Sequence, residues 1–237
     1  MTVLILAGTA EARRVIETCR DLDVRASLAG LTRAPDLPVP TRIGGFGGPV
    51  GFRAELDRVT AVLDATHPFA GMASRTARLC AEAGVPHLRL VRAPWPVRSG
   101  WRLHPDLAAA ARALPPDARV FLAVGPGGVA PFLGRGLRLW CRRIDPAPPL
   151  DGVEWIIGRP GGVAAEERLL SRIAATHLVA KQSGGPSAAK LDAAERLRIA
   201  VEMVRRPALP RETITSDVAE AVAFVHRHAG PRPVVGG

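Results

Sequence analysis

A short apolar strand, a turn of small residues and an amphipathic helix open the chain, and this succession constrains its fold more than any other feature. Val3 to Leu6 form a continuous apolar run, which is typical of a strand buried on both faces of a sheet. The turn Ala7-Gly8-Thr9 follows, and apolar side chains then recur at helical spacing between positions 12 and 19. This order predicts the first unit of an α/β domain with a parallel sheet.

The same turn is a candidate phosphate site. At a helix N-terminus the backbone N–H groups point outward and the helix dipole favours an anion, while Gly8 lets a ligand approach the backbone closely. Gly8, Thr9 and Glu11 are therefore candidate cofactor-binding residues. The dinucleotide fingerprint has three glycines at fixed spacing and only Gly8 is present, so from this stretch alone an ordinary βα turn is an equal alternative.

Apolar runs and helical patterns alternate along the whole chain, which predicts parallel sheets with helices on both faces. We expect strands at residues 3–6, 24–29, 59–63, 85–90, 119–124, 137–142, 153–158, 177–180 and 199–204. We expect helices at residues 12–19, 49–58, 70–83, 106–114, 164–174, 187–197 and 217–227, and another helix after the turn at 125–128. Ser216 is the expected N-cap of the last helix. The strands form two series that divide near residue 115, although no sequence repeat relates them.

Length and composition indicate a globular chain with a sizeable core. The chain has 237 residues, 47% of them hydrophobic, but no apolar run long enough for a membrane helix and no signal-peptide pattern. Its three cysteines, Cys19, Cys80 and Cys141, are far apart in the sequence. We therefore expect a cytoplasmic protein with neither a disulfide framework nor a metal site.

The net charge of +10, from 32 basic and 22 acidic residues, indicates an anionic partner such as nucleic acid, a phosphate or a polycarboxylate. An Arg-rich composition without any partner is the alternative. The absence of tyrosine and the aromatic content of 4% disfavour nucleic acid.

The end of the second expected strand bears on the choice of cofactor. A fold that binds NAD carries an acidic residue near this point for the ribose 2′-hydroxyl, and here no acid occurs before Asp36. Thr32 and Arg33 instead offer a hydroxyl and a guanidinium, which suit a 2′-phosphate. A solvated turn arginine is the alternative interpretation.

Two further segments are candidate parts of the same site. Four glycines surround one phenylalanine at 44–48, so Gly44 and Gly45 could lie flat against a ligand or belong to a flexible connection. The expected strand at 59–63 delivers Asp64, Thr66 and His67, and ligands of open α/β sheets lie at the carboxyl ends of strands. A structural histidine is the alternative for His67.

Lys181 is one of only two lysines, and it lies at an expected strand end. Ser183, Gly184 and a helix follow it, so a cation, a hydroxyl and a glycine-rich helix start together predict a site for a carboxylate or a phosphate. A surface lysine at the end of a strand is the alternative. Arg89 and Arg92 alternate with apolar residues around another strand end.

Together these motifs resemble the family of precorrin-6A reductases and cobalt-precorrin-6A reductases of cobalamin biosynthesis. The segments that carry the resemblance are Leu6–Arg13, Gly44–Gly48, Asp64–Ala70, Leu88–Trp95, Lys181–Gly185, Lys190–Ala194 and Val204–Pro207. Their order and spacing are more specific than any one of them, and they span nearly the whole chain. The chain departs from the family pattern at Ala7, Ala10 and Gln182, where glycine or threonine is usual.

The resemblance implies an oxidoreductase that transfers hydride from NADPH to a double bond of the tetrapyrrole precorrin-6A, giving precorrin-6B. It also implies two Rossmann-like domains with the active site in the cleft between them. We expect an NADPH-binding domain at 1–115, a substrate-binding domain at 116–230 and a disordered tail at 231–237. His67, Asp64 and Lys181 are the candidate catalytic residues, unranked as proton donors. Thr66 is expected to contact the cofactor, and Arg89, Arg92, Lys181, Ser183 and Gly184 to bind the substrate carboxylates.

Several alternatives stay open. The substrate could contain cobalt, or the chain could be a nucleotide sensor without catalytic activity. A short-chain reductase is disfavoured because the chain has no tyrosine for the Tyr-Lys pair, and a tetrapyrrole methyltransferase would need S-adenosylmethionine. We expect no nucleic-acid or membrane partner, and the oligomeric state stays open, with a monomer as one option.

Overall fold

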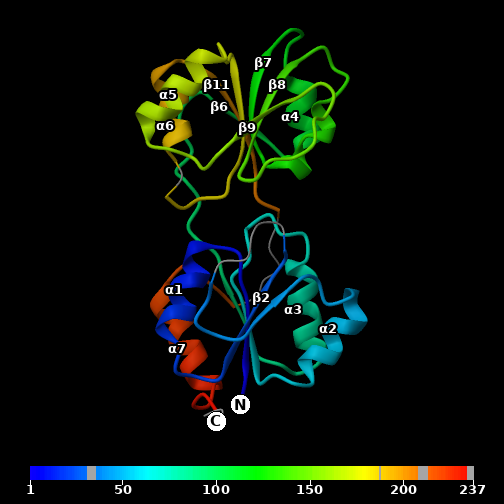
Figure 1. Cartoon of the computed structure of the whole chain (residues 1–237), viewed down its shortest axis with the longest axis vertical. Coiled ribbons are helices and arrows are strands. Elements are labelled where there is room, and N and C mark those ends of the chain that lie inside the picture. Colours follow the sequence, from blue (N-terminus) through cyan, green and yellow to red (C-terminus); the bar gives the residue numbers. More distant parts are fainter. Residues whose placement is uncertain (31–35, 187, 208–212, 234–237) are drawn as a thin grey trace. The chain divides into compact units, whose positions relative to one another are not determined.

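The computed structural model describes residues 1–30, 36–186, 188–207 and 213–233. The chain forms two compact units (Figure 1). The first comprises Met1–Ala93 together with Ala208–Gly237, and the second comprises Pro94–Pro207. The division therefore falls between residues 93 and 94, earlier than the expected 115, and the last part of the chain returns to the first unit.

The first unit is a parallel six-stranded sheet with helices on both faces (Figure 1). Its strands, in spatial order, are β12 (Ile214–Thr215), β5 (His87–Leu90), β4 (Ala61–Asp64), β1 (Val3–Leu6), β2 (Val24–Leu28) and β3 (Thr41–Ile43). Its helices are α1 (Ala10–Thr18), α2 (Gly48–Leu56), α3 (Ala73–Glu82) and α7 (Val218–His228). Helices α1 and α7 cover one face, and α2 and α3 cover the other.

Strand β1 lies at the centre of this sheet, between β2 and β4. Val3 and Ile5 belong to the apolar cluster on the α1–α7 face, whereas Leu4 and Leu6 belong to the cluster on the α2–α3 face. A strand buried on both faces needs a continuous apolar run, so the structure confirms the interpretation of the opening segment.

The second unit repeats this architecture with its own parallel sheet. Its strands, in spatial order, are β6 (Trp101–His104), β11 (Ala200–Val204), β10 (His177–Lys181), β7 (Arg119–Ala123), β8 (Arg138–Arg143) and β9 (Glu154–Ile157). Its helices are α4 (Leu107–Ala113), α5 (Val163–Arg172) and α6 (Ala189–Arg196), with the 3₁₀ turns η1 (Pro126–Gly128) and η2 (Ala130–Phe132). The apolar residues of α5 and α6 pack on one face of this sheet.

Each sheet has one central strand, β1 or β7, with two strands on one side and three on the other. This is the doubly wound order, in which ligands bind where the connections diverge, between β1 and β4 and between β7 and β10. The outermost strand on the three-strand side of each sheet follows a crossing of the chain from one unit to the other. This strand is β12 in the first unit and β6 in the second. Residues 101–113, expected in the first domain, therefore belong to the second, and α7 belongs to the first.

The structure corrects several local expectations. Strands β3, β6 and β12 were not expected, and two 3₁₀ turns replace the helix expected after the turn at 125–128. Asp217, not Ser216, caps α7, because its Oδ1 accepts a hydrogen bond from the N–H of Ala219 at 2.8 Å. In the expected tail, Pro231 pairs with Leu22, whereas residues 234–237 lie outside the described part of the chain.

Within the described ranges, we find no helix with the length and apolar character needed to cross a bilayer. The three cysteines are free and buried. Burial raises the pKa of the Cys19 thiol to about 11. Burial also raises the pKa of Cys141 to about 11.

Candidate functional site

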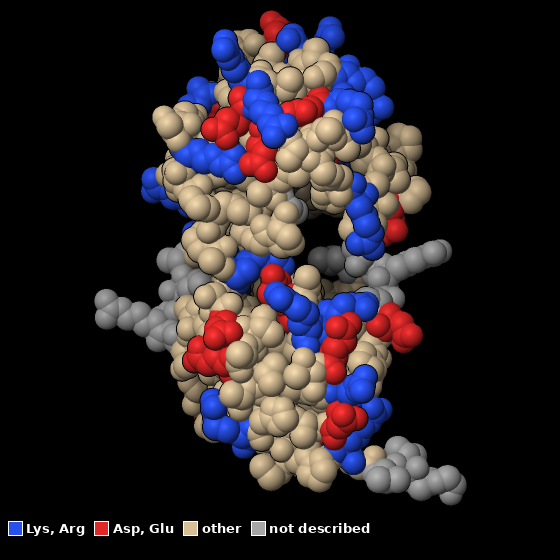
Figure 2. All heavy atoms as spheres, turned by 90° about the vertical axis from the view of Figure 1, so that its left-hand side faces the viewer, with Lys and Arg blue, Asp and Glu red and all other residues tan. Residues whose placement is uncertain are grey.

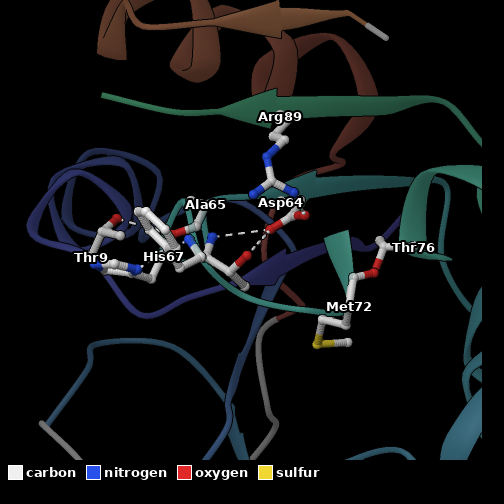
Figure 3. Close-up of polar contacts among 9 residues, drawn as sticks. Thr9, Asp64, Ala65, His67, Met72, Thr76 and Arg89 are labelled. Atoms are coloured by element: carbon white, nitrogen blue, oxygen red, sulfur yellow. Dashed lines mark hydrogen bonds and ion pairs between the residues drawn. The ribbon is translucent and has the colours of Figure 1, made fainter. Parts of the chain in front are cut away.

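The candidate site of the first unit lies where its strand order reverses, at the carboxyl ends of β1 and β4. Thr9 joins the loops that follow these two strands. Its Oγ1 accepts a hydrogen bond from the N–H of Ala12 at 3.1 Å, which caps α1, and donates to the carbonyl of Ala65 at 3.0 Å. One side chain therefore fixes both the helix N-terminus and the loop that carries Thr66 and His67 (Figure 3).

The turn beside Thr9 is open to a ligand. Gly8 is exposed, and a Cβ atom built on it would meet no atom within 4 Å. The N-terminus of α1 beyond this turn offers backbone N–H groups and a favourable dipole for an anion. The geometry is that of a phosphate-binding βα turn.

Glu11, in the first turn of α1, is engaged within the protein. Its Oε2 lies 2.9 Å from Nη2 of Arg92, and its side chain is about nine-tenths buried. The expectations had assigned Glu11 to the cofactor and Arg92 to the substrate. The structure pairs them instead, so Glu11 compensates the charge of Arg92 beside the turn.

Asp64, at the end of β4, is fully buried and has three hydrogen bonds. Its Oδ2 accepts from Nη1 of Arg89 at 2.8 Å, and its Oδ1 accepts from the N–H and the Oγ1 of Thr66 at 3.0 and 2.6 Å (Figure 3). A carboxylate in this setting holds a loop and does not reach a ligand. This corrects the expectation that Asp64 is a catalytic residue.

Arg89 is also corrected, from a substrate-binding residue to a core residue. Only 1% of it is exposed. The parallel register of β4 and β5 places it opposite Asp64. Its Nε and Nη2 have no hydrogen-bond partner among the described residues. The pKa of the neighbouring His87 is lowered, mainly by burial. The charge of Asp64 acts to raise this pKa, and the charge of Arg89 acts to lower it.

His67 lies on the loop that Thr9 and Asp64 hold from two sides (Figure 3). Its Nδ1 accepts a hydrogen bond from the N–H of Phe69 at 3.2 Å, so a neutral ring carries its proton on Nε2. The imidazole is half-buried. The structure therefore brings Thr9, Thr66 and His67 together, with His67 presenting Nε2 as its protonated atom.

The glycine-rich segment after β3 is held by an aromatic contact. The guanidinium of Arg42 lies 4.7 Å from the ring centroid of Phe46 and donates to the carbonyl of Gly45. Space is open above Gly44 and Gly45, where an added Cβ would meet nothing within 4 Å. Thr32 and Arg33, the residues expected to bind a 2′-phosphate, lie outside the described part of the chain.

In the second unit, Lys181 ends β10, and the loop that follows carries Ser183 and Gly184 at the other point of strand reversal. Lys181 is half-buried, and burial lowers the pKa of its amine. Three side chains outside the candidate site residues, Trp95, Gln182 and Arg206, hydrogen-bond this loop or its anchor. Their sequence separations of up to 90 residues hide these contacts from any local pattern.

The total charge does not mark a site by itself. On the surface that Figure 2 shows, basic and acidic side chains lie next to one another within each unit. Arg196 and Glu167, for example, join α6 to α5 with an N–O distance of 3.2 Å. The site assignment therefore depends on strand ends and on specific contacts.

Comparison with known proteins gives a consistent family. The model of the family described as "Precorrin-6x reductase CbiJ/CobK" matches residues 2–226. The precorrin-6A reductase of Rhodobacter capsulatus is 41% identical over 248 residues, covering 98% of this chain and 99% of that protein. The precorrin-6A reductase of Rhodococcus erythropolis is 43% identical over 240 residues, covering 94% and 96%. A solved structure described as CobK precorrin-6A reductase matches with a TM-score of 0.87 at 40% identity, covering 99% of this chain and all of that one.

Proposed function

Since the chain belongs to the precorrin-6x reductase family (CbiJ/CobK), we propose that it catalyses the reduction of precorrin-6A to precorrin-6B in cobalamin biosynthesis, with NADPH as the hydride donor. The observation that carries the nucleotide site is the double hydrogen bond of Thr9. It fixes the α1 N-terminus and the β4 loop together at the strand reversal, beside the open turn at Gly8.

The preference for NADPH over NADH is supported by the end of β2. This strand ends at Leu28, and no acidic residue follows it before Asp36, so the carboxylate that binds a free ribose 2′-hydroxyl is missing from the sequence. Arg33, which lies outside the described residues, is the basic candidate for the 2′-phosphate.

When bound, NADPH supplies the hydride, and the chain's own residues position the reactants and manage charge. We assign the proton that the reduced macrocycle needs to His67 in its imidazolium form, which donates from Nε2 and is left as neutral imidazole. Nδ1 carries the second proton in that form, so it gives up the hydrogen bond that it accepts from the N–H of Phe69 in the neutral ring. Asp64 and Thr66 are positioning residues, because their hydrogen bonds hold the loop that carries the His67 ring. Lys181 is the alternative donor, since burial lowers the pKa of its amine.

The peripheral carboxylates of the substrate suit the cations and backbone N–H groups of the second unit. Lys181 ends β10, and Ser183 and Gly184 follow it, at the strand end where an α/β sheet binds ligands. Arg92 of the first unit pairs with Glu11 at 2.9 Å and keeps 15% of its side chain exposed, so we retain it as a further candidate for a substrate carboxylate. Arg89 has no place in this set, because it is enclosed with Asp64.

A cytoplasmic setting is part of the proposal and is supported by the three free, buried thiols. The first unit would bind the nucleotide and the second the tetrapyrrole.

The test of the reaction is a single-turnover assay with purified protein, NADPH and either precorrin-6A or its cobalt complex. The proposal predicts loss of nicotinamide absorbance in proportion to added precorrin-6A. Oxidation with the cobalt complex alone would move the chain to the cobalt-dependent alternative. Nucleotide binding without oxidation by either substrate would favour a sensor.

A further inference from the structure

The loop after β10 is anchored by the amide of Gln182, which is 7% exposed. Its Oε1 accepts from the N–H of Trp95 at 3.0 Å, and its Nε2 donates to the carbonyl of Trp95 at 2.9 Å. Both polar atoms of the amide therefore hydrogen-bond to the backbone of one residue, Trp95. A buried amide satisfied in this way has one orientation, so it defines where the loop begins.

The indole of Trp95 holds the far end of the same loop. Its Nε1 donates to the carbonyl of Gly185 at 2.8 Å, and the side chain is buried. The Nζ of Lys190, on α6, lies 4.7 Å from the indole centroid. A cation over the face of the ring adds a second restraint to the indole plane.

Arg206 holds the middle of the loop. Its Nε donates to the carbonyl of Gln182 at 2.7 Å, and its Nη2 donates to the carbonyl of Ser183 at 3.1 Å. The carbonyls of residues 182, 183 and 185 thus all face side-chain donors. We call Trp95, Gln182 and Arg206 the loop clamp.

The clamp determines where the N–H of Gly184 points. In a trans peptide the N–H lies opposite the carbonyl of the preceding residue, so the N–H of Gly184 points away from Arg206. Gly184 and Gly185 have φ values of 68° and 81°, a region that favours glycine. Within the described residues, neither of these two N–H groups donates a hydrogen bond to another protein group.

Charge around the loop favours an anion at the N–H of Gly184. Lys181 ends β10 directly before the loop, and the guanidinium of Arg206 lies against the carbonyls of the loop. Trp95 and Arg206 are also the second residue and the last but one of the second unit, which is Pro94–Pro207. The clamp therefore fastens both ends of this unit's chain to the loop.

We propose that the loop clamp positions the N–H of Gly184 for a carboxylate of the tetrapyrrole substrate. This inference rests on the proposed function. Trp95, Gln182 and Arg206 act as positioning residues, since their own polar groups are used within the protein. The loop, not the clamp, contacts the carboxylate.

The test compares steady-state kinetics with precorrin-6A for Trp95→Phe, Gln182→Met and a matched control, Trp155→Phe. Trp95→Phe keeps an aromatic side chain but loses the indole donor and the volume of the second fused ring. Trp155 makes the same kind of bond, from Nε1 to the carbonyl of Pro148 at 2.9 Å, on an exposed part of the same unit. The control thus removes an equivalent bond that does not touch the loop.

We expect KM for precorrin-6A to rise about fivefold to tenfold in Trp95→Phe and Gln182→Met, the effect of roughly one hydrogen bond, with kcat and NADPH affinity unchanged. Trp155→Phe should keep the wild-type KM. Gln182→Glu should approach the wild-type KM as the pH falls, because only a protonated carboxyl can donate to the Trp95 carbonyl as the amide does.

A wild-type KM in Trp95→Phe, whatever its loss of stability, would overturn the proposal and leave the clamp a purely structural feature. Trp95→Phe decides the matter if Gln182→Met does not fold. A wild-type protein that does not turn over precorrin-6A would remove the proposed function itself, which is a different result from active enzyme with unchanged KM.

Discussion

Nη1 of Arg89 donates to Oδ2 of Asp64 at 2.8 Å, and this ion pair is enclosed in the first unit, with 1% and none of the two side chains exposed. The other carboxylate oxygen of Asp64 accepts both the N–H and the hydroxyl of Thr66. A buried charge pair therefore sets the path of the loop that leads to His67. Removing one member would leave the other charge buried without compensation.

Arg89→Met should lower the free energy of unfolding by about 3–5 kcal/mol, because Asp64 loses its cation in the core. Urea denaturation measures this loss. Arg25→Met is the matched control: Arg25 pairs with Glu55 at 2.7 Å but is 38% exposed, so its loss should cost about 1 kcal/mol or less. Equal costs for the two variants would contradict the account of the buried pair.

His67→Ala should lower kcat well below the wild-type value and leave the NADPH dissociation constant nearly unchanged, because Nε2 is proposed to act on the substrate. The informative partner variant is His67→Asn, whose amide oxygen can still accept from the N–H of Phe69 but whose side chain cannot supply a proton. Normal turnover in His67→Asn would show that His67 only shapes the loop.

Thr9→Val should weaken NADPH binding by roughly tenfold and cost about 1 kcal/mol of stability, since it removes both the α1 cap and the bond to Ala65. Thr9→Ser retains the hydroxyl and should behave like the wild type. Calorimetric titration of both variants measures the difference. If Thr9→Val bound NADPH as tightly as Thr9→Ser, the bridging role of Thr9 would be excluded.

Lys190 gives the second unit a predictable response to pH. Burial lowers the pKa of its amine from the ordinary 10.5 to about 8, although Glu166 acts to raise it. Between these two values the unfolded chain binds the proton and the folded chain does not, so stability rises with pH, by up to about 3 kcal/mol in total. Below the folded pKa both states are protonated, so Lys190 makes the stability no longer depend on pH and the gain of about 3 kcal/mol is absent.

Lys190→Met isolates this effect, because the buried thiols titrate in an overlapping range with the opposite sign. The pKa of Cys141 is raised from 9.0 to about 11, so its contribution falls as the pH rises between these values. The difference in unfolding free energy between the wild type and Lys190→Met should therefore change steadily from about pH 8 upward. A constant difference would mean that Lys190 titrates normally.

The sequence was informative where burial imposes a pattern. Strands such as β1 are covered on both faces, so their apolar runs predict them, and the α/β architecture with two parallel sheets is confirmed. Strands β3, β6 and β12 escaped prediction because they lie at sheet edges and are short, and because all residues of β3 and β6 and one of the two in β12 are exposed or half-buried. Since β12 comes from the returning chain, the division of the units could not be found from consecutive strands.

For the site, strand ends were the useful signal, and contacts between distant residues were not accessible. Asp64, Thr66 and His67 do lie at the end of β4. The pairing of Asp64 with Arg89 depends on the register of two strands, and the contact of Trp95 with Gln182 spans 87 residues. A charged residue within an apolar strand, as at Arg89, is a signal that could have indicated a buried counterion.

The nucleotide site at the first turn is the central claim, and calorimetric titration of NADPH and NADH into the purified protein tests it most directly. NADPH should bind clearly more tightly than NADH, and Thr9→Val should reduce the affinity for NADPH. Equal affinity for the two nucleotides would contradict the argument from the missing acid after β2. Absence of binding by either would contradict the nucleotide site itself.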